Sequence, residues 1–185
     1  PELPDARRER FVREYGLSAY DASVLTASRP SADYYEALVK ASAAEPKICA
    51  NWQTGELASA LNRDQLDISA SRVGPDLLAD VLRKIADGTL SGKTAKQVFD
   101  VVWAIGPNAS VDAVIEKEGL QQISDPGAIE KLVDEVIAKN ARQAADYRAG
   151  KEKAFNSLVG QVMKASQGKA NPAQVNAVLR RKLGR

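Results

Sequence analysis

Two short apolar stripes at helical spacing between residues 151 and 185 constrain the fold more than any other feature of the sequence. The first stripe consists of residues that recur at i, i+3, i+4, i+7 and i+8: Phe155, Leu158, Val159, Val162 and Met163. Gly168 follows it as a stop signal, and Asn171-Pro172 is a start signal for a second helix. The second stripe comprises Val175, Val178, Leu179 and Leu183. Such a pair buries both stripes only against a further element, so the pattern predicts a helical hairpin docked on a small bundle.

A third stripe supplies that further element, and its members are Ile129, Leu132, Val133, Val136 and Ile137. Residues 119–127, just before it, are punctuated by glycine and proline, which is typical of a domain boundary. Alternating β-branched sequence is nearly absent, so a sheet has little support. The sequence therefore predicts an all-α protein, with a larger helical domain over residues 1–122 and a small helical tail domain over residues 123–185. We expect a mobile connection with few contacts between the two.

Histidine is absent and Cys49 is the only cysteine, which together exclude several kinds of site. An intrachain disulfide, a zinc site of the usual Cys/His kind and imidazole catalysis are all excluded. We therefore expect no metal site and no catalytic residue in this chain, and Cys49 fits a small core residue. No apolar run reaches the roughly 18 residues of a membrane span, so we expect a cytoplasmic protein without a membrane partner. The start at Pro1-Glu2, without methionine, is typical of a fragment of a longer chain.

Residues 87–94, DGTLSGKT, resemble a phosphate-binding P-loop at first sight. The two glycines, Gly88 and Gly92, have one residue fewer between them than that motif requires, and a helical pattern precedes them instead of a strand. The spacing instead indicates that Gly88 ends one helix and that Ser91 caps the next.

The net charge of +2 hides a strong division along the chain. Residues 1–139 carry 16 Lys/Arg and 22 Asp/Glu, whereas residues 140–185 carry 10 and 2. A basic segment that keeps its apolar periodicity predicts a folded module that binds a polyanion. A lysine-rich surface that contacts only solvent is the alternative that this pattern leaves open.

The strings DGTLSGKTAKQVF, LQQISDPGAIEKLVDEV and DYRAGKEKAFNSLVGQVMKASQGKANPAQVN, with the basic end RRKL, resemble the C-terminal part of the B subunit of aspartyl/glutamyl-tRNA amidotransferases, the GatB/YqeY family. The resemblance implies a heterotrimeric ligase in which the A subunit releases ammonia from glutamine and the C subunit links the other two. The B subunit would amidate the misacylated tRNA with ATP and magnesium, in a catalytic part N-terminal to all these residues. The helical and tail domains would hold the tRNA body at its outer corner, near the D-loop. The implied partners are tRNA and the A and C subunits, without DNA, and no cofactor belongs to this chain.

The candidate tRNA-binding residues all lie in or next to the basic tail: Tyr147, Lys151, Lys153, Lys164, Lys169, Arg180, Arg181 and Lys182. Arg180 and Arg181 suit forked contacts to phosphate, whereas the position of Lys182 near the second stripe predicts a packed stem with its charge in water. Tyr147 is a candidate for stacking on a base, while Phe155 starts a stripe and fits the core. The helix that follows Asn171 is expected to offer free N–H groups to a phosphate.

Two other classes of function remain open from the sequence. In the first, the acidic helical domain docks partner subunits and the basic tail contacts no tRNA. In the second, the chain is itself an enzyme, for which no residue pattern here provides a nucleophile with its base.

Overall fold

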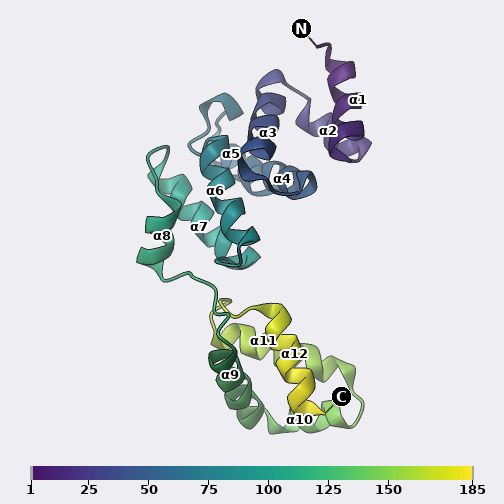
Figure 1. The fold of residues 1–185 in the computed structure, drawn as a ribbon, viewed down its shortest axis with the longest axis vertical. Coiled ribbons are helices and arrows are strands. Elements are labelled where there is room, and N and C mark those ends of the chain that lie inside the picture. The colour runs from purple at the N-terminus through teal and green to yellow at the C-terminus, as the bar shows by residue number, and fades with distance from the viewer. Residues whose placement is uncertain (1, 185) are drawn as a thin grey trace. The chain divides into compact units, whose positions relative to one another are not determined.

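The computed structural model describes residues 2–184, which fold into helices joined by loops (Figure 1). This confirms the predicted all-α class, since the only β-type pairing in that part of the chain is an isolated parallel bridge between Ile123 and Ala170. The contacts divide the chain into two compact units. Unit 1 runs as far as Asp87 and resumes over Ala95–Glu118, and unit 2 comprises Gly88–Thr94 and the chain from Gly119 onward.

Unit 1 is built from helices of one to four turns. They are α1 Pro4–Tyr15, α2 Ala19–Leu25, α3 Arg29–Ser42, α4 Pro46–Trp52, the π-helix η1 Gln53–Leu57, α5 Ala58–Asp64, the 3-10 turn η2 Ile68–Ala70, α6 Pro75–Ala86, α7 Gly92–Ile105 and α8 Val111–Glu118. Helices α3 and α6 pack together, and the rings of Phe11, Tyr15 and Tyr35 meet with centroids 5.2 to 5.4 Å apart.

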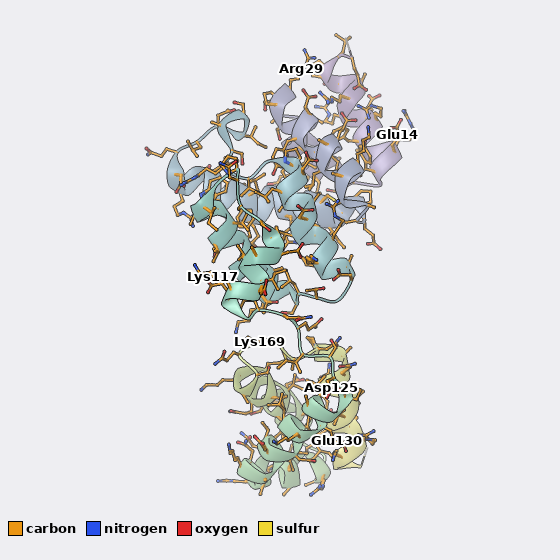
Figure 2. All side chains as sticks on the ribbon, turned by 60° about the vertical axis from the view of Figure 1, so that its left-hand side comes forward. Glu14, Arg29, Lys117, Asp125, Glu130 and Lys169 are labelled. Atoms are coloured by element: carbon orange, nitrogen blue, oxygen red, sulfur yellow. The ribbon has the colours of Figure 1, made fainter. Side chains whose placement is uncertain are left out.

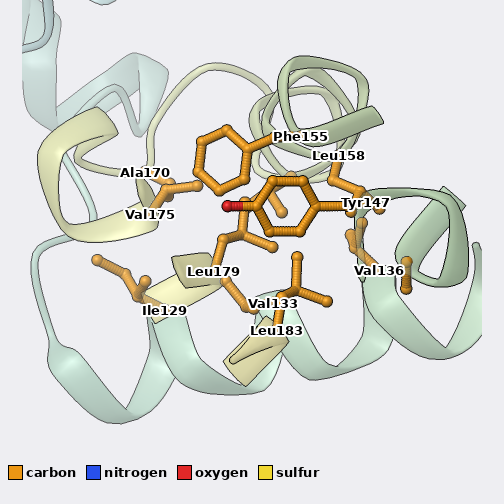
Figure 3. Packing of buried hydrophobic residues seen from close by; sticks show 12 residues of the cluster. Ile129, Val133, Val136, Tyr147, Phe155, Leu158, Ala170, Val175, Leu179 and Leu183 are labelled. Atoms are coloured by element: carbon orange, nitrogen blue, oxygen red, sulfur yellow. The ribbon is translucent and has the colours of Figure 1, made fainter. Parts of the chain in front are cut away.

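Within the described residues, unit 2 contains the first residues of α7, Gly92–Thr94, and the helices α9 Pro126–Lys139, α10 Ala141–Arg148, α11 Glu152–Ala165 and α12 Pro172–Leu183. The three predicted stripes supply its core, where α9 contacts both α11 and α12 and α10 packs on α11. Figure 3 shows this core from close by. Its buried residues are Ile129, Val133, Val136, Ala144, Tyr147, Phe155, Leu158, Val162, Ala170, Val175, Leu179 and Leu183. The docked hairpin expected from the stripes is therefore the arrangement that forms.

The turn between α11 and α12 is closed by left-handed backbone at two consecutive residues, Gln167 with φ 56° and Gly168 with φ 78°. The amide of Gly168 donates to the carbonyl of Met163 at 2.7 Å, and that of Gln167 donates to Lys164 at 3.0 Å. These two bonds form a Schellman motif, which satisfies the last carbonyls of α11. The stop signal at Gly168 is real, but the helix ends at Ala165 and Gln167 is the first residue with left-handed backbone.

The loop before α7 is tied to this turn, as is the segment before α9. The hydroxyl of Ser91 donates to the carbonyl of Gly168 at 3.1 Å. The amide of Ile123 donates to the carbonyl of Lys169 at 2.7 Å, and the amide of Asn171 donates to the carbonyl of Ile123 at 3.0 Å. Three stretches that are distant in sequence thus form one hydrogen-bonded cluster within unit 2.

The segment proposed as a boundary, residues 119–127, is therefore hydrogen-bonded to unit 2 and is not a linker without contacts. Unit 2 also includes Gly88–Thr94, which the sequence places in the first domain. The division into independently folding parts at residues 122 and 123 stays a prediction.

The core of unit 2 should be sensitive to loss of volume at Leu158, which is fully buried on α11. We expect Leu158→Ala to destabilise unit 2 by about 2–5 kcal/mol, because a large-to-small change loses transfer energy and leaves a cavity. Amide hydrogen exchange followed by mass spectrometry localises the effect, and α9 to α12 should exchange faster. A matched change at the exposed Lys153, also on α11, should leave exchange unchanged. Equal protection in both variants would contradict a packed core here.

Candidate nucleic-acid interface

Two lysines lie on one exposed face of α11. Lys153 and Lys164 are both exposed, and their separation of 11 residues corresponds to just over three turns. Their backbone positions are therefore about 16 Å apart along the helix axis and within about 20° around it. Neither forms an ion pair with any of residues 2–184. This face of α11 presents positive charge that the described chain does not neutralise.

Lys169 adds a further positive charge at the turn that follows α11. Its backbone is fixed, because its carbonyl accepts from Ile123 and its amide donates to Ser166 at 3.1 Å. Its ammonium extends over the segment before α9, 4.0 Å from where a β-carbon at Gly119 would stand. No carboxylate within the described range pairs with it. The fold thus fixes the base of this side chain and leaves its charge available.

Lys182 differs from these lysines, because its ammonium lies between two carboxylates of α9. It is 2.8 Å from Glu130 and 2.8 Å from Asp134, and its side chain is only 25% exposed. Arg181 also reaches Glu130, at 3.4 Å. The expectation that the Lys182 charge extends to water was wrong, because α12 packs along α9 and brings the carboxylates within reach. Figure 2 shows Glu130 and Lys169 well apart on unit 2.

The contact between Lys182 and Glu130 shifts the pKa values of both side chains. The hydrogen bond from Lys182 holds the pKa of Glu130 below its ordinary value. The hydrogen bonds to Asp134 and then Glu130 raise the pKa of Lys182. Both shifts favour the charged forms, so this pair joins α12 to α9 and is less available to an external anion.

Two other candidate cations have internal contacts as well. The ammonium of Lys151 is 3.0 Å from the carboxylate of Asp146 in the preceding helix. The guanidinium of Arg180 lies over the ring of Phe155, 4.9 Å from its centroid, where the electrons of the ring face attract it. Arg180 remains exposed on its other side, so it keeps donors that a phosphate can accept.

The two aromatic candidates both lie in the core, where their rings pack with centroids 5.2 Å apart (Figure 3). Phe155 is 6% exposed, as its place in the stripe predicts. Tyr147 is 1% exposed, so its ring has no open face for a base in this structure. We therefore correct its assignment from stacking residue to core residue. It is buried because α10 packs directly on α11.

The start of α12 is also occupied. The side-chain carbonyl of Asn171 accepts from the amides of Ala173 at 3.0 Å and Gln174 at 3.3 Å. The amide of Val175 donates to the backbone carbonyl of Asn171, and Pro172 has no amide hydrogen. The free N–H groups expected at this end are therefore not free, since the cap residue accepts their hydrogen bonds.

The P-loop-like string, residues 87–94, has a structural role in the hydrogen-bonded cluster around the turn between α11 and α12. Ser91 accepts a hydrogen bond from the amide of Thr94 at 3.2 Å, and Thr94 accepts one from the amide of Ser91 at 2.9 Å. This reciprocal pair confirms Ser91 as a helix cap, and it turns the amide of Ser91 away from any external phosphate. The arrangement does not fit the nucleotide loop that the glycine and lysine residues suggest.

Lys93 of the same string is a residue that reasoning from the sequence alone missed. Its side chain lies across Gly168, with its Cδ 2.6 Å from where a β-carbon would stand. A segment that joins two helices in the sequence thus supplies a lysine to the surface of the tail turn. The available signal was the lysine in the P-loop-like string, but the failed motif gave no reason to group it with the tail.

Comparison with known families identifies the class to which this arrangement belongs. The family model described as the GatB domain matches residues 33–183. The chain therefore belongs to the GatB family.

Individual relatives agree with this assignment. The chain is 54% identical over 187 residues to the aspartyl/glutamyl-tRNA(Asn/Gln) amidotransferase B subunit of Burkholderia pseudomallei, with 100% of this chain covered. It is 56% identical over 183 residues to the protein of that name from Methylobacillus flagellatus and 55% identical to that from Nitrosococcus oceani, with 99% covered in each case. The chain spans only 38% of the length of these relatives.

Residues 2–184 contain neither a metal-binding cluster nor a membrane-spanning helix. No cluster of three or more acidic or cysteine side chains is placed to hold a metal ion. No helix in the described range has the length and apolar character to cross a bilayer.

The contact of Lys182 with Glu130 should appear in the acid stability of the protein. The pKa of Glu130 is lowered in the folded state, so its contribution is present above its ordinary value of 4.5 and is lost as the pH falls through the folded pKa. We expect Lys182→Met to be less stable than wild type at pH 6. The difference between the two should shrink on acidification towards pH 3, because the wild type then loses the same contact. Thermal unfolding followed by circular dichroism at each pH measures this, and parallel curves would contradict the ion pair.

Proposed function

We propose that this chain is the tRNA-holding C-terminal part of an amidotransferase B subunit. In this proposal it binds the tRNA body at the outer corner, on the D-loop side, and presents misacylated Asp-tRNA(Asn) or Glu-tRNA(Gln) for ATP-dependent amidation. The observation that carries it is the group of unpaired lysines on α11 and its following turn, in a chain of the GatB family. Lys153 and Lys164 are exposed and Lys169 is half-buried, and none of the three has a carboxylate partner among the described residues, as a surface for phosphates requires.

The chemistry of amidation is assigned in this proposal to the part of the longer relatives that this chain does not cover. ATP and magnesium would act there, and the A and C subunits would complete the enzyme. The residues present here support a binding role, because the P-loop-like string is occupied by its own capping bonds and no histidine is available. A tRNA held by its phosphates and riboses is recognised largely through shape, which suits a rigid helical module.

A second candidate function belongs to unit 1, which would then dock partner subunits. A groove of about 300 Å³ lies between α7 and α8, lined by Val101, Ile105 and Val114, and Ile105 is 55% exposed. An apolar groove of this kind suits a protein surface better than a phosphate backbone. If this is the only function, a mobility shift at low and at high salt should show no tRNA binding at either.

The proposed interface predicts that the triple variant Lys153→Ala, Lys164→Ala, Lys169→Ala binds a tRNA transcript more weakly and remains folded. Phosphate contacts release counterions, so the slope of log affinity against log salt should flatten by roughly 0.7–0.9 per lost contact. Fluorescence anisotropy over a salt series measures both quantities, and circular dichroism monitors folding.

The matched control removes three cations from α9 and α10, with Lys131, Lys139 and Arg142 changed to alanine. This variant has the same net charge as the first but keeps the α11 face, so it should bind nearly as wild type does. An equal loss in both variants would show attraction by net charge without a defined face. No loss in either would remove the basis for the proposal.

A further inference from the structure

Lys93 is the strongest candidate for an additional contact residue, because the fold places it beside Gly168, which is distant from it in the sequence. Its stem lies over Gly168, with Cε 3.2 Å and Nζ 3.3 Å from the position of a β-carbon there. Gly168 is followed directly by Lys169, so the side chain of Lys93, from the start of α7, lies against the turn that carries Lys169. Any larger residue at Gly168 would displace the Lys93 side chain and would also be strained at φ 78°.

The position of Lys93 is determined by its own segment. The hydroxyl of Ser91 donates to the carbonyl of Gly168. The amide of Ser91 donates to the Thr94 hydroxyl and the amide of Thr94 donates to the Ser91 hydroxyl, so the backbone on both sides of Lys93 is hydrogen-bonded. The turn that carries Lys169 is fixed in the same cluster by Ile123. The two ammonium groups are therefore presented by rigid backbone, which reduces the entropy lost when an anion is bound.

The charges at this turn have no counter-ion within the described part of the chain. No ion pair there involves Lys93 or Lys169, whereas Lys96, one turn further along α7, is 2.6 Å from Glu56. Two cations at one turn, without a counter-ion among the described residues, give this surface a positive potential that attracts an external anion. The phosphate of a nucleic-acid backbone is an anion of suitable charge and reach.

We infer that Lys93 is part of the RNA-binding surface of unit 2 and contacts a backbone phosphate beside the one that Lys169 contacts. This rests on the proposed function and deepens it, because it adds to the tail surface a residue from the P-loop-like string. The string then has a phosphate-contacting lysine although it does not form a nucleotide loop.

The test measures binding of an unmodified tRNA transcript to the whole chain carrying Lys93→Gln, over a salt series. We expect the salt slope to flatten by roughly 0.7–0.9 and the affinity near 0.1 M salt to fall by up to about tenfold, as the loss of one phosphate contact predicts. Lys93→Arg keeps the charge and should bind within about twofold of wild type. The matched control is Lys96→Gln on the same helix, whose charge is already paired, and it should have little effect.

The outcomes separate this inference from the proposed function. If Lys93→Gln binds with wild-type affinity and slope while the triple lysine variant does not, the inference fails and the proposed function stands. If neither variant loses affinity, both fail. Equal losses with Lys93→Gln and Lys96→Gln would also overturn the inference, since the effect would then follow net charge alone.

A different observation, the exposed glycine in the middle of α11, supports a second inference about the same surface. Gly160 is exposed, and a β-carbon added to it would meet nothing within 4 Å. Glycine in a helix interior is less favourable than alanine, and neither packing nor backbone conformation in this chain requires it here. Around the helix axis it is about 20° from Lys153 and about 40° from Lys164, both in the same direction, and along the axis it lies between them. The glycine thus lies between the two unpaired lysines of the exposed face.

We also infer that the RNA backbone crosses α11 at Gly160, where the missing side chain lets it approach the helix closely. The two flanking lysines would then contact phosphates on either side of the crossing. This inference also rests on the proposed function, but it depends on shape where the first depends on charge.

The test compares Gly160→Ala and Gly160→Leu with wild type for both stability and tRNA binding. Gly160→Ala should raise the unfolding midpoint by a few degrees, because alanine is the better helix former. It should nevertheless weaken tRNA binding several-fold, and Gly160→Leu should weaken it further, with the salt slope nearly unchanged. Variants that are more stable and bind as wild type does would overturn this inference. The triple lysine variant reports on the proposed function independently.

Discussion

The burial of three apolar stripes against one another is the constraint on which unit 2 depends. Each of α9, α11 and α12 is short, and a helix of this length is marginal in water without tertiary contacts. Packing the stripes together determines how each helix is rotated about its own axis. That rotation in turn decides which side chains face out, so Lys153 and Lys164 are exposed because Leu158 and Val162 are buried. The proposed binding face is therefore a direct consequence of the core.

Features that follow from local sequence were predictable. The stripes, the Ser91 cap, the start of α12 at Asn171-Pro172 and the core position of Phe155 all depend on residues within one or two turns, where periodicity and capping rules apply. The shared face of Lys153 and Lys164 also follows from their spacing, because helix geometry relates any two positions once the helix exists.

Features that depend on contacts between distant segments were not predictable. Lys182 is paired because α9 lies beside α12, and nothing near Lys182 in the sequence indicates the carboxylates it meets. Tyr147 is buried because α10 folds back on α11, although its own helix is short and polar. Lys93 joins the tail turn through the Ser91 contact with Gly168, which no local rule anticipates. In each case the tertiary arrangement decided which charged or aromatic groups remain available.

The basic charge of the tail therefore has two roles, which the charge count alone does not separate. Lys151, Arg181 and Lys182 have carboxylates within 4 Å, and they help to hold neighbouring helices or turns in place. Lys153, Lys164 and Lys169 have none among the described residues, so their charge is neutralised by solvent ions or by a partner. A folded module gains specificity when its cations are divided in this way into paired and unpaired sets. Cations paired within the fold make it rigid, and that rigidity keeps the unpaired cations at fixed spacing for a phosphate backbone.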